Sequence, residues 1–230
     1  MLLSLKHQFL FVHIAKTGGT SVRAALTRYR YQGPCGVPMW LANKLDQLCR
    51  HRIATKFPRH AKAIAAQEML PAEVYRKLYK FVFVRNPWDL QVSSYHHLQR
   101  EHPHLLTHIH SFSDFIRYKF DPQRPWNYLL DTSLERQRDY LVDLQGNVIV
   151  DYIGHYENLQ ADFGHICTHI GLKPVDLPHK RKATSRQDYR RYYDDESAER
   201  VAQHYAQDIA LFGYQFDGVS PDSAIETLKR

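Results

Sequence analysis

A buried strand followed by a polar loop and then a helix occurs twice in this chain, and this order restricts the fold more than any other feature. The apolar run Phe9–Val12 is followed by HIAKTGG and by a helix predicted over Thr20–Tyr29. The run Phe81–Val84 is followed by RNPWD and by a helix predicted over Leu90–Gln99. Short runs rich in aromatic and β-branched residues are typical of buried strands. The repeated order predicts an α/β fold, a mostly parallel sheet flanked by helices on both faces.

The remaining elements follow from apolar residues at regular spacing. A third strand is predicted at Val148–Ile153, and further helices are predicted at Arg59–Leu70, Ala72–Tyr79, Glu157–Ile170 and Asp195–Leu211. The stretch Arg100–Pro125 lacks regular spacing and is predicted to form loops over one edge of the sheet. No internal repeat or Pro/Gly/Ser-rich linker divides the sequence, so residues 1–230 are predicted to form a single domain.

Composition narrows the class of protein. With 43% hydrophobic and 24% charged residues, the chain is typical of a globular protein. Its net charge of +7 favours an anionic ligand such as a phosphorylated cofactor, a nucleic acid or an acidic polymer. Three cysteines, an odd number with no CxxC pair, argue against a disulfide framework and favour a reducing compartment.

The sequence also bears on location. No apolar run approaches the roughly 20 residues that a membrane-spanning helix requires. The opening MLLSLKHQFLFV is interrupted by polar residues after Leu5, and no small-residue cleavage site follows, so it does not resemble a signal peptide. A cytoplasmic location in a bacterial cell is therefore predicted.

The first loop, HIAKTGGTS at His13–Ser21, has the properties of an anion-binding loop. Its two glycines let the backbone approach a ligand closely, and the first turn of the following helix presents free N–H groups. Lys16 adds a full charge but precedes Gly18, whereas a Walker lysine follows its second glycine. The alternative is an ordinary strand-to-helix turn with Thr20 as the N-cap. The residues predicted to bind the anion are Lys16, Thr17, Gly18, Gly19, Thr20 and Ser21.

The second loop, RNPWDLQVSS, begins with Arg85 at the end of a strand and carries Ser93 about two turns along a helix. Ligands of open α/β sheets bind at the carboxyl ends of the strands. The planar fork of an arginine suits a doubly charged phosphate because it can donate two parallel hydrogen bonds. The alternative makes Arg85 a surface ion pair and Ser93 a solvated helix residue.

A run of histidines raises the question of a metal. Six lie within His96–His110, and His104 and His108 are four residues apart, which could place both on one helix face. However, no HExxH is present, and no cysteine or carboxylate pattern joins them. No metal site is predicted.

The residues alone leave three kinds of function open. Binding of a phosphorylated ligand fits two anion loops in one sheet. A nucleotide-dependent kinase is disfavoured by the missing Walker lysine and the lack of a clear magnesium-binding carboxylate motif. A basic nucleic-acid-binding domain would account for the net charge of +7 but leaves both loops unexplained.

The segments KTGGTS and FVFVRNPWDLQVSSYHH resemble the two cofactor loops of sulfotransferases that use 3′-phosphoadenosine 5′-phosphosulfate (PAPS). The carbohydrate branch, similar to the heparan sulfate 2-O- and 6-O-sulfotransferases and their bacterial relatives, matches best. The resemblance continues through QRDYLVDLQGNVIVDYIGHYENL and DYRRYYDDESAERVAQHYAQDIALFGYQF, and so covers most of the chain. This sequence departs from the family by Ala15 where proline is frequent, Asn86 where aspartate is frequent, and His155 where arginine is frequent.

The resemblance implies a P-loop-like fold and a set of roles. Residues Lys16–Ser21 would hold the 5′-phosphosulfate, and Arg85 and Ser93 the 3′-phosphate. Lys182 and Thr184 lie where the family closes a loop over the 3′-phosphate.

The resemblance also implies a catalytic histidine between the two loops. His60, in KFPRHAKAIAA, takes that place, and His51 is its competitor. The implied reaction is an in-line displacement to a hydroxyl of a glycan-type acceptor, with His60 as base and Lys16 at the leaving group. It implies no metal and no nucleic-acid partner.

Overall fold

The structure is a computed structural model that describes residues 1–30, 32, 37–38, 40–41, 57–178 and 187–219. Contacts within the chain divide it into two compact units. The first unit comprises Met1–Ile14, Gly18–Phe83 and Tyr140–Lys180, and the second comprises Ala15–Thr17, Val84–Asp139 and Arg181–Arg230. Neither unit is a continuous stretch of sequence, and the single domain over 1–230 stays a prediction.

The first unit is built on a four-stranded sheet with the order β1-β2-β3-β4. Strand β1 (Leu2–Ser4) pairs antiparallel with β2 (Phe9–Val12), and β2 pairs parallel with β3 (Tyr79–Val84). Strand β4 (Tyr152–His155) completes the sheet beside β3. The predicted mostly parallel sheet is therefore confirmed.

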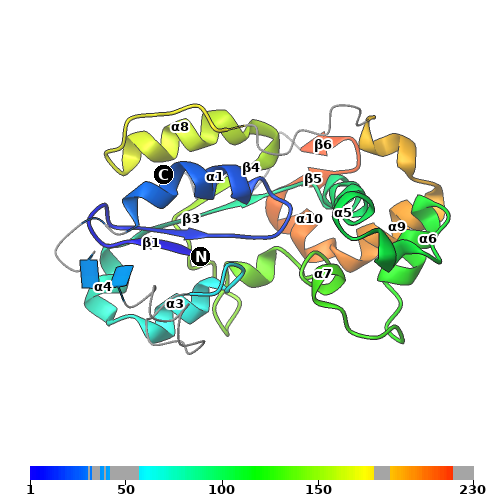
Figure 1. Cartoon of the computed structure of the whole chain (residues 1–230), viewed down its shortest axis with the longest axis horizontal. Coiled ribbons are helices and arrows are strands. Elements are labelled where there is room, and N and C mark those ends of the chain that lie inside the picture. The colour runs from blue at the N-terminus through cyan, green and yellow to red at the C-terminus, as the bar shows by residue number, and fades with distance from the viewer. Residues whose placement is uncertain (31, 33–36, 39, 42–56, 179–186, 220–230) are drawn as a thin grey trace. The chain divides into compact units, whose positions relative to one another are not determined.

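Helices of the first unit cover both faces of this sheet. Helices α1 (Gly19–Leu26) and α8 (Leu159–His169) lie over one face, and α3 (Ala63–Met69) and α4 (Ala72–Lys77) lie over the other, as Figure 1 shows. This arrangement confirms the predicted α/β layering.

The core of the first unit follows from the alternation of side chains along the central strands. Phe9 and Phe11 of β2 pack with Phe81 and Phe83 of β3 in one fully buried cluster, which also includes residues of α1 and α8. Rings of Phe11 and Phe81 stack with their centroids 5.3 Å apart. The intervening residues, such as Leu10, are equally buried on the other face. Burial on both faces is the reason why these strands are continuous apolar runs.

The second unit is mainly helical. It contains α5 (Pro87–Glu101), α6 (Phe112–Lys119), α7 (Tyr128–Asp131), α9 (Asp195–His204), α10 (Ala206–Phe212) and the hairpin of β5 (Tyr214–Gln215) and β6 (Gly218–Val219). The core of the second unit contains Trp88, Val92, Phe115, Leu130, Val201 and Tyr205.

Short 3₁₀ helices occur in both units. They lie at Thr27–Tyr29, Pro103–Leu106, Arg138–Tyr140, Tyr156–Asn158 and Tyr189–Tyr192.

Several predicted elements need correction. The helix predicted over Arg59–Leu70 begins at Ala63. The helix predicted over Ala72–Tyr79 ends at Lys77, because Tyr79 is the first residue of β3.

The prediction that Arg100–Pro125 forms loops is wrong for α6, where Phe112, Phe115 and Ile116 are buried at helical spacing and Ser111 caps the helix by accepting from the N–H of Asp114. The helix predicted over Asp195–Leu211 breaks at Tyr205 into two helices.

The strand predicted at Val148–Ile153 is displaced toward the C-terminus, to Tyr152–His155. Val148 instead forms an isolated antiparallel bridge with Val142, on the other side of a turn at Gly146. The start of the apolar run thus pairs with Val142, and its end belongs to β4 of the main sheet.

Two glycines offer a matched test of this packing. A Cβ at Gly154 in β4 would lie 2.5 Å from the ring of the fully buried Phe83, whereas a Cβ at Gly164 in α8 would meet no heavy atom within 4 Å. Gly154→Ala should lower the free energy of unfolding by about 1–3 kcal/mol, since a well-packed core resists added volume. Gly164→Ala should raise it by about 0.5–1 kcal/mol because alanine loses less entropy in a helix. Urea unfolding checks both signs, and an unchanged Gly154→Ala protein would contradict this packing.

Candidate functional site

The first predicted loop connects the end of β2 to the start of α1. Its backbone is left-handed at two positions, Lys16 with φ 67° and Gly18 with φ 79°. A left-handed lysine is unfavourable by roughly 1–2 kcal/mol and persists only where the surroundings enforce it. Gly18 is the N-cap of α1, so Thr20 lies inside the helix and the alternative with Thr20 as N-cap is wrong. The first turn has no side-chain cap and no acidic residue, which leaves its positive end suited to an anion.

Close packing explains both glycines of this loop. A Cβ at Gly19 would lie 2.1 Å from the imidazole of His13, and a Cβ at Gly18 would lie 2.7 Å from the side chain of Leu159. His13 itself is buried directly beneath the start of α1. Gly19 therefore lets the chain pass close to His13, and Gly18 lets it pack against Leu159.

The predicted base His60 lies in the same unit as His13 and contacts it. The Nδ1 atom of His60 is 2.9 Å from the carbonyl oxygen of His13, and the two rings are 4.8 Å apart. Because a carbonyl oxygen can only accept, Nδ1 carries the hydrogen and Nε2 of the neutral ring keeps its lone pair. Burial lowers the pKa of His60, opposed by this hydrogen bond, and the charge of Arg59 lowers it further. A neutral imidazole with an available Nε2 is what a general base requires.

The second predicted loop begins at Arg85, which is buried at the end of β3. Its Nη1 donates to the carbonyl oxygen of Lys16 at 2.9 Å, and its Nε donates to Asp89 Oδ2 at 2.6 Å. The structure therefore brings the two predicted loops into direct contact within the second unit. The ion pair with Asp89 exists, but both side chains are largely buried, so the alternative of a surface pair is wrong.

Asn86 explains one departure from the family pattern. Its Oδ1 accepts from the N–H of Trp88 and caps α5, while its Nδ2 donates to the carbonyl oxygen of Gln215 at 2.8 Å. An ionised aspartate could make the first bond but not the second, since it has no hydrogen to donate. The asparagine thus ties the start of α5 to the β5–β6 hairpin.

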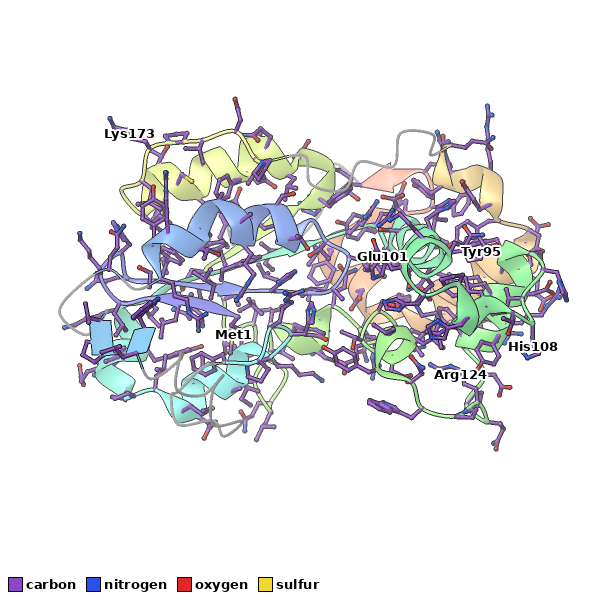
Figure 2. All side chains as sticks on the ribbon, viewed as in Figure 1. Met1, Tyr95, Glu101, His108, Arg124 and Lys173 are labelled. Carbon is purple, nitrogen blue, oxygen red and sulfur yellow. The ribbon has the colours of Figure 1, made fainter. Side chains whose placement is uncertain are left out.

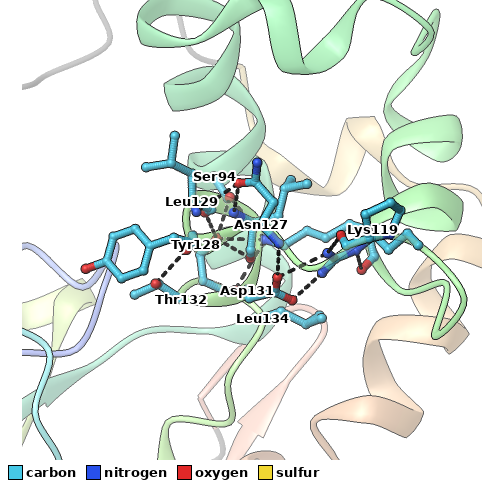
Figure 3. Close-up of polar contacts among 12 residues, drawn as sticks. Ser94, Lys119, Asn127, Tyr128, Leu129, Asp131, Thr132 and Leu134 are labelled. Carbon is cyan, nitrogen blue, oxygen red and sulfur yellow. Dashed lines mark hydrogen bonds and ion pairs between the residues drawn. The ribbon is translucent and has the colours of Figure 1, made fainter.

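Helix α5 also carries Ser93, which is half-buried, and Ser94, which faces a buried lysine. Lys119 is fully buried, and its Nζ donates to Gln91 Oε1 at 2.7 Å. It also donates to Ser94 Oγ at 3.1 Å, and both Lys119 and Ser94 are labelled in Figure 3. Ser133 provides a further oxygen at 2.8 Å. Burial lowers the pKa of Lys119 well below its usual range, and the charges of Arg124 and Lys16 add to the effect.

The other predicted residues fall into two groups. Thr17 is buried, Thr20 is exposed, and the hydroxyl of Ser21 donates to the carbonyl oxygen of Pro178 at 2.8 Å. Lys182 and Thr184 lie outside the described residues, as does the competing candidate base, His51.

Within the described ranges, no group of three or more His, Cys, Asp and Glu side chains could hold a metal ion. This includes the histidines of His96–His110, where the rings of His97 and His102 are 5.8 Å apart and those of His102 and His104 are 6.0 Å apart. None of the helices in the described part is both long and apolar enough to cross a membrane.

The buried polar residues for which sequence reasoning indicated no role include His13, Lys119, Gln137 and Asp208. Gln137 opens the QRDYL stretch, where resemblance to the family was visible but no role was indicated. Asp208 accepts from the N–H groups of Gln137 and Arg138, and burial raises its pKa to about 6. Lys119 had no signal, because it lies in a stretch without regular apolar spacing and lysine is ordinarily a surface residue.

The comparisons with known proteins decide the family. A family model described as "Sulfotransferase family" matches residues 1–215, nearly the whole chain. This protein belongs to the sulfotransferase family. Membership of this family supports sulfuryl transfer in general.

The chain is also similar to two other proteins. An uncharacterized protein of Archaeoglobus fulgidus is 30% identical over 128 residues, which cover 54% of this chain and 95% of that protein. A crystal structure of a sulfotransferase from Alicyclobacillus acidocaldarius aligns with a TM-score of 0.49 at 18% identity, over 88% of this chain and 92% of the other.

The buried Lys119 predicts a pH dependence of stability. The unfolded chain holds this proton up to about pH 10.4, whereas the folded protein releases it at a lower pH, so stability should rise with pH across that window. The free energy of unfolding of the wild-type protein, measured relative to Lys119→Met by urea unfolding from pH 7 to pH 10, should therefore increase with pH.

The matched control is Lys173→Met, at an exposed lysine that Figure 2 labels at the edge of the first unit. This substitution should leave the pH dependence of the wild-type protein unchanged. If the difference in free energy of unfolding between the wild-type protein and Lys119→Met stayed constant from pH 7 to pH 10, burial would not perturb the pKa of Lys119.

Proposed function

We propose that this sulfotransferase moves the sulfuryl group of PAPS to a hydroxyl of a carbohydrate-type acceptor. The observation that carries the proposal is the hydrogen bond from Arg85 Nη1 to the carbonyl oxygen of Lys16. It joins the loop that resembles the 5′-phosphosulfate loop of the family to the loop that resembles its 3′-phosphate loop. A donor with anionic groups at both positions fits two joined loops better than a donor with one.

The proposed donor contacts come from the resemblance to the family, and the backbone geometry of the first loop supports them. The left-handed backbone at Lys16 and Gly18 and the uncapped start of α1 would hold the 5′-phosphosulfate. Thr17, Gly19, Thr20 and Ser21 belong to the same proposed loop. Arg85 and Ser93 would hold the 3′-phosphate, and Lys182 and Thr184 remain proposed ligands.

The proposed reaction uses two side chains. His60 Nε2 takes the proton of the acceptor hydroxyl as its oxygen forms a bond to sulfur. The bond from sulfur to the bridging oxygen breaks, and its electron pair stays on the departing adenosine 3′,5′-bisphosphate. Lys16 and the N–H groups of its loop stabilise the charge that develops there, so the protein acts by positioning and by electrostatics.

The acceptor is proposed from the resemblance to the carbohydrate branch, and the net charge of +7 suits an acidic glycan. A cytoplasmic location is proposed with it. Transfer of radiolabel from ³⁵S-PAPS to a panel of glycans, with phenols and duplex DNA as competing acceptors, tests the proposal. If the radiolabel appeared on a phenol and on none of the glycans, the acceptor would not be a carbohydrate and the proposed acceptor class would be wrong.

Arg85 should govern recognition of the 3′-phosphate. Arg85→Ala should weaken binding of adenosine 3′,5′-bisphosphate roughly ten- to a hundredfold, because a charge-assisted hydrogen bond contributes about 1.5–3 kcal/mol. Binding of adenosine 5′-monophosphate, which lacks that phosphate, should fall much less. Isothermal titration of both ligands gives the ratio of the two dissociation constants.

The matched control is Arg124→Ala, which removes another buried arginine of the second unit, paired with Asp131 at 2.5 Å. It should lower stability and leave that ratio unchanged. An equal loss of affinity for both nucleotides in Arg85→Ala would make Arg85 a purely structural residue.

His60 should act as the base. Since burial lowers the pKa of His60, kcat/KM should fall on acidification through an apparent pKa below the ordinary value of about 6.5. His60→Ala should lose this acidic limb and about 10²–10⁴-fold in kcat, and should still bind adenosine 3′,5′-bisphosphate. His51→Ala, the competing candidate, should be almost silent; an inactive His51→Ala beside an active His60→Ala would reverse the assignment.

A further inference from the structure

The backbone of Arg85 is held on both sides by one buried amide. Gln137 is fully buried, and its Oε1 accepts from the N–H of Arg85 at 2.8 Å while its Nε2 donates to the carbonyl oxygen of Arg85 at 2.8 Å. Arg85 is the first residue after β3, where the chain leaves the sheet. The side chain of Gln137 therefore supplies both hydrogen bonds that the backbone of Arg85 needs once it is buried beyond the strand.

Gln137 is itself fixed from α10. Asp208, also fully buried, accepts from the N–H of Gln137 at 2.7 Å and from the N–H of Arg138 at 3.0 Å. Two N–H donors to one carboxylate hold the backbone at this point in a single position. The orientation of the Gln137 amide thus depends on a residue 71 positions away in sequence.

The same set of hydrogen bonds continues from Arg85 to the first loop. Arg85 Nη1 donates to the carbonyl oxygen of Lys16, the residue with the left-handed backbone. Hydrogen bonds therefore connect Asp208 to Gln137 at 2.7 Å, Gln137 to Arg85 at 2.8 Å and Arg85 to Lys16 at 2.9 Å. All four residues belong to the second unit.

We infer that Gln137, held by Asp208, is a positioning residue that sets the backbone of Arg85 and, through its guanidinium, the backbone of Lys16. The inference rests on the proposed function in that Arg85 and Lys16 are taken to act on the donor. A guanidinium extends several bonds from its Cα, so a small rotation of the Arg85 backbone displaces it from the Lys16 carbonyl oxygen. Displacements of about 1 Å at a catalytic group can cost on the order of 10²-fold in rate.

Gln137→Glu is the sharpest variant, because it keeps the shape and the acceptor for the N–H of Arg85 but places an oxygen opposite the carbonyl oxygen of Arg85. Val201→Ala is the control, since it removes buried volume from a core cluster of the same unit that includes none of the four residues. Amide hydrogen exchange, read by mass spectrometry on peptides covering residues 14–18 and 84–86, reports the local backbone. Values of kcat and KM with PAPS report the reaction.

Gln137→Glu should speed exchange in both peptides at least tenfold and lower kcat about 10- to 100-fold with a smaller change in KM. Val201→Ala should leave the exchange of both peptides and kcat close to the wild-type values. Asp208→Asn should reproduce the Gln137→Glu effects, and the double variant should show less than the product of the two single effects, as expected for residues in one network.

The inference is overturned when Gln137→Glu and Val201→Ala give the same exchange rates and the same kcat. Asp208→Asn makes the same comparison should Gln137→Glu not fold. A wild-type protein that neither binds adenosine 3′,5′-bisphosphate nor uses PAPS would refute the proposed function alone. The exchange measurement then decides the inference, because faster exchange at residues 14–18 supports the positioning of Lys16 and unchanged exchange refutes it.

Discussion

The hydrogen bond from Arg85 to the carbonyl oxygen of Lys16 is the interaction on which the proposed site depends. Strands β2 and β3 are parallel neighbours, so the segments that follow them leave the sheet at the same edge. That topology brings the two loops near each other, but it does not fix either one. The Arg85 contact does so by holding Lys16 in a left-handed conformation that its side chain disfavours.

Much of this arrangement could be predicted from local sequence. The runs Phe9–Val12 and Phe81–Val84 are strands or parts of strands in the structure, and the glycines of the first loop lie where close packing requires them. Family membership could be predicted as well, because the loop residues are contiguous in sequence. The start of α1 was misjudged by one residue, since the position of a cap depends on backbone conformation rather than on a favoured residue type.

The rest could not be predicted because it depends on pairs that are distant in sequence. Gln137 is 52 positions from the Arg85 backbone that it holds, and Asp208 is a further 71 positions away. The buried ammonium of Lys119 donates hydrogen bonds to Gln91, Ser94 and Ser133. No periodicity in the sequence relates these residues to Lys119. Buried polar groups of this kind are stable only when every partner is in place, so they become visible only in the folded chain.

Two joined anion loops should select a nucleotide with phosphates at both the 3′ and 5′ positions. Isothermal titration of the wild-type protein with adenosine 3′,5′-bisphosphate, with ATP and magnesium, and with duplex DNA at one salt concentration tests it most directly. We expect adenosine 3′,5′-bisphosphate to bind most tightly, ATP more weakly and DNA more weakly still. Binding of ATP at equal or higher affinity, or of DNA alone, would contradict it.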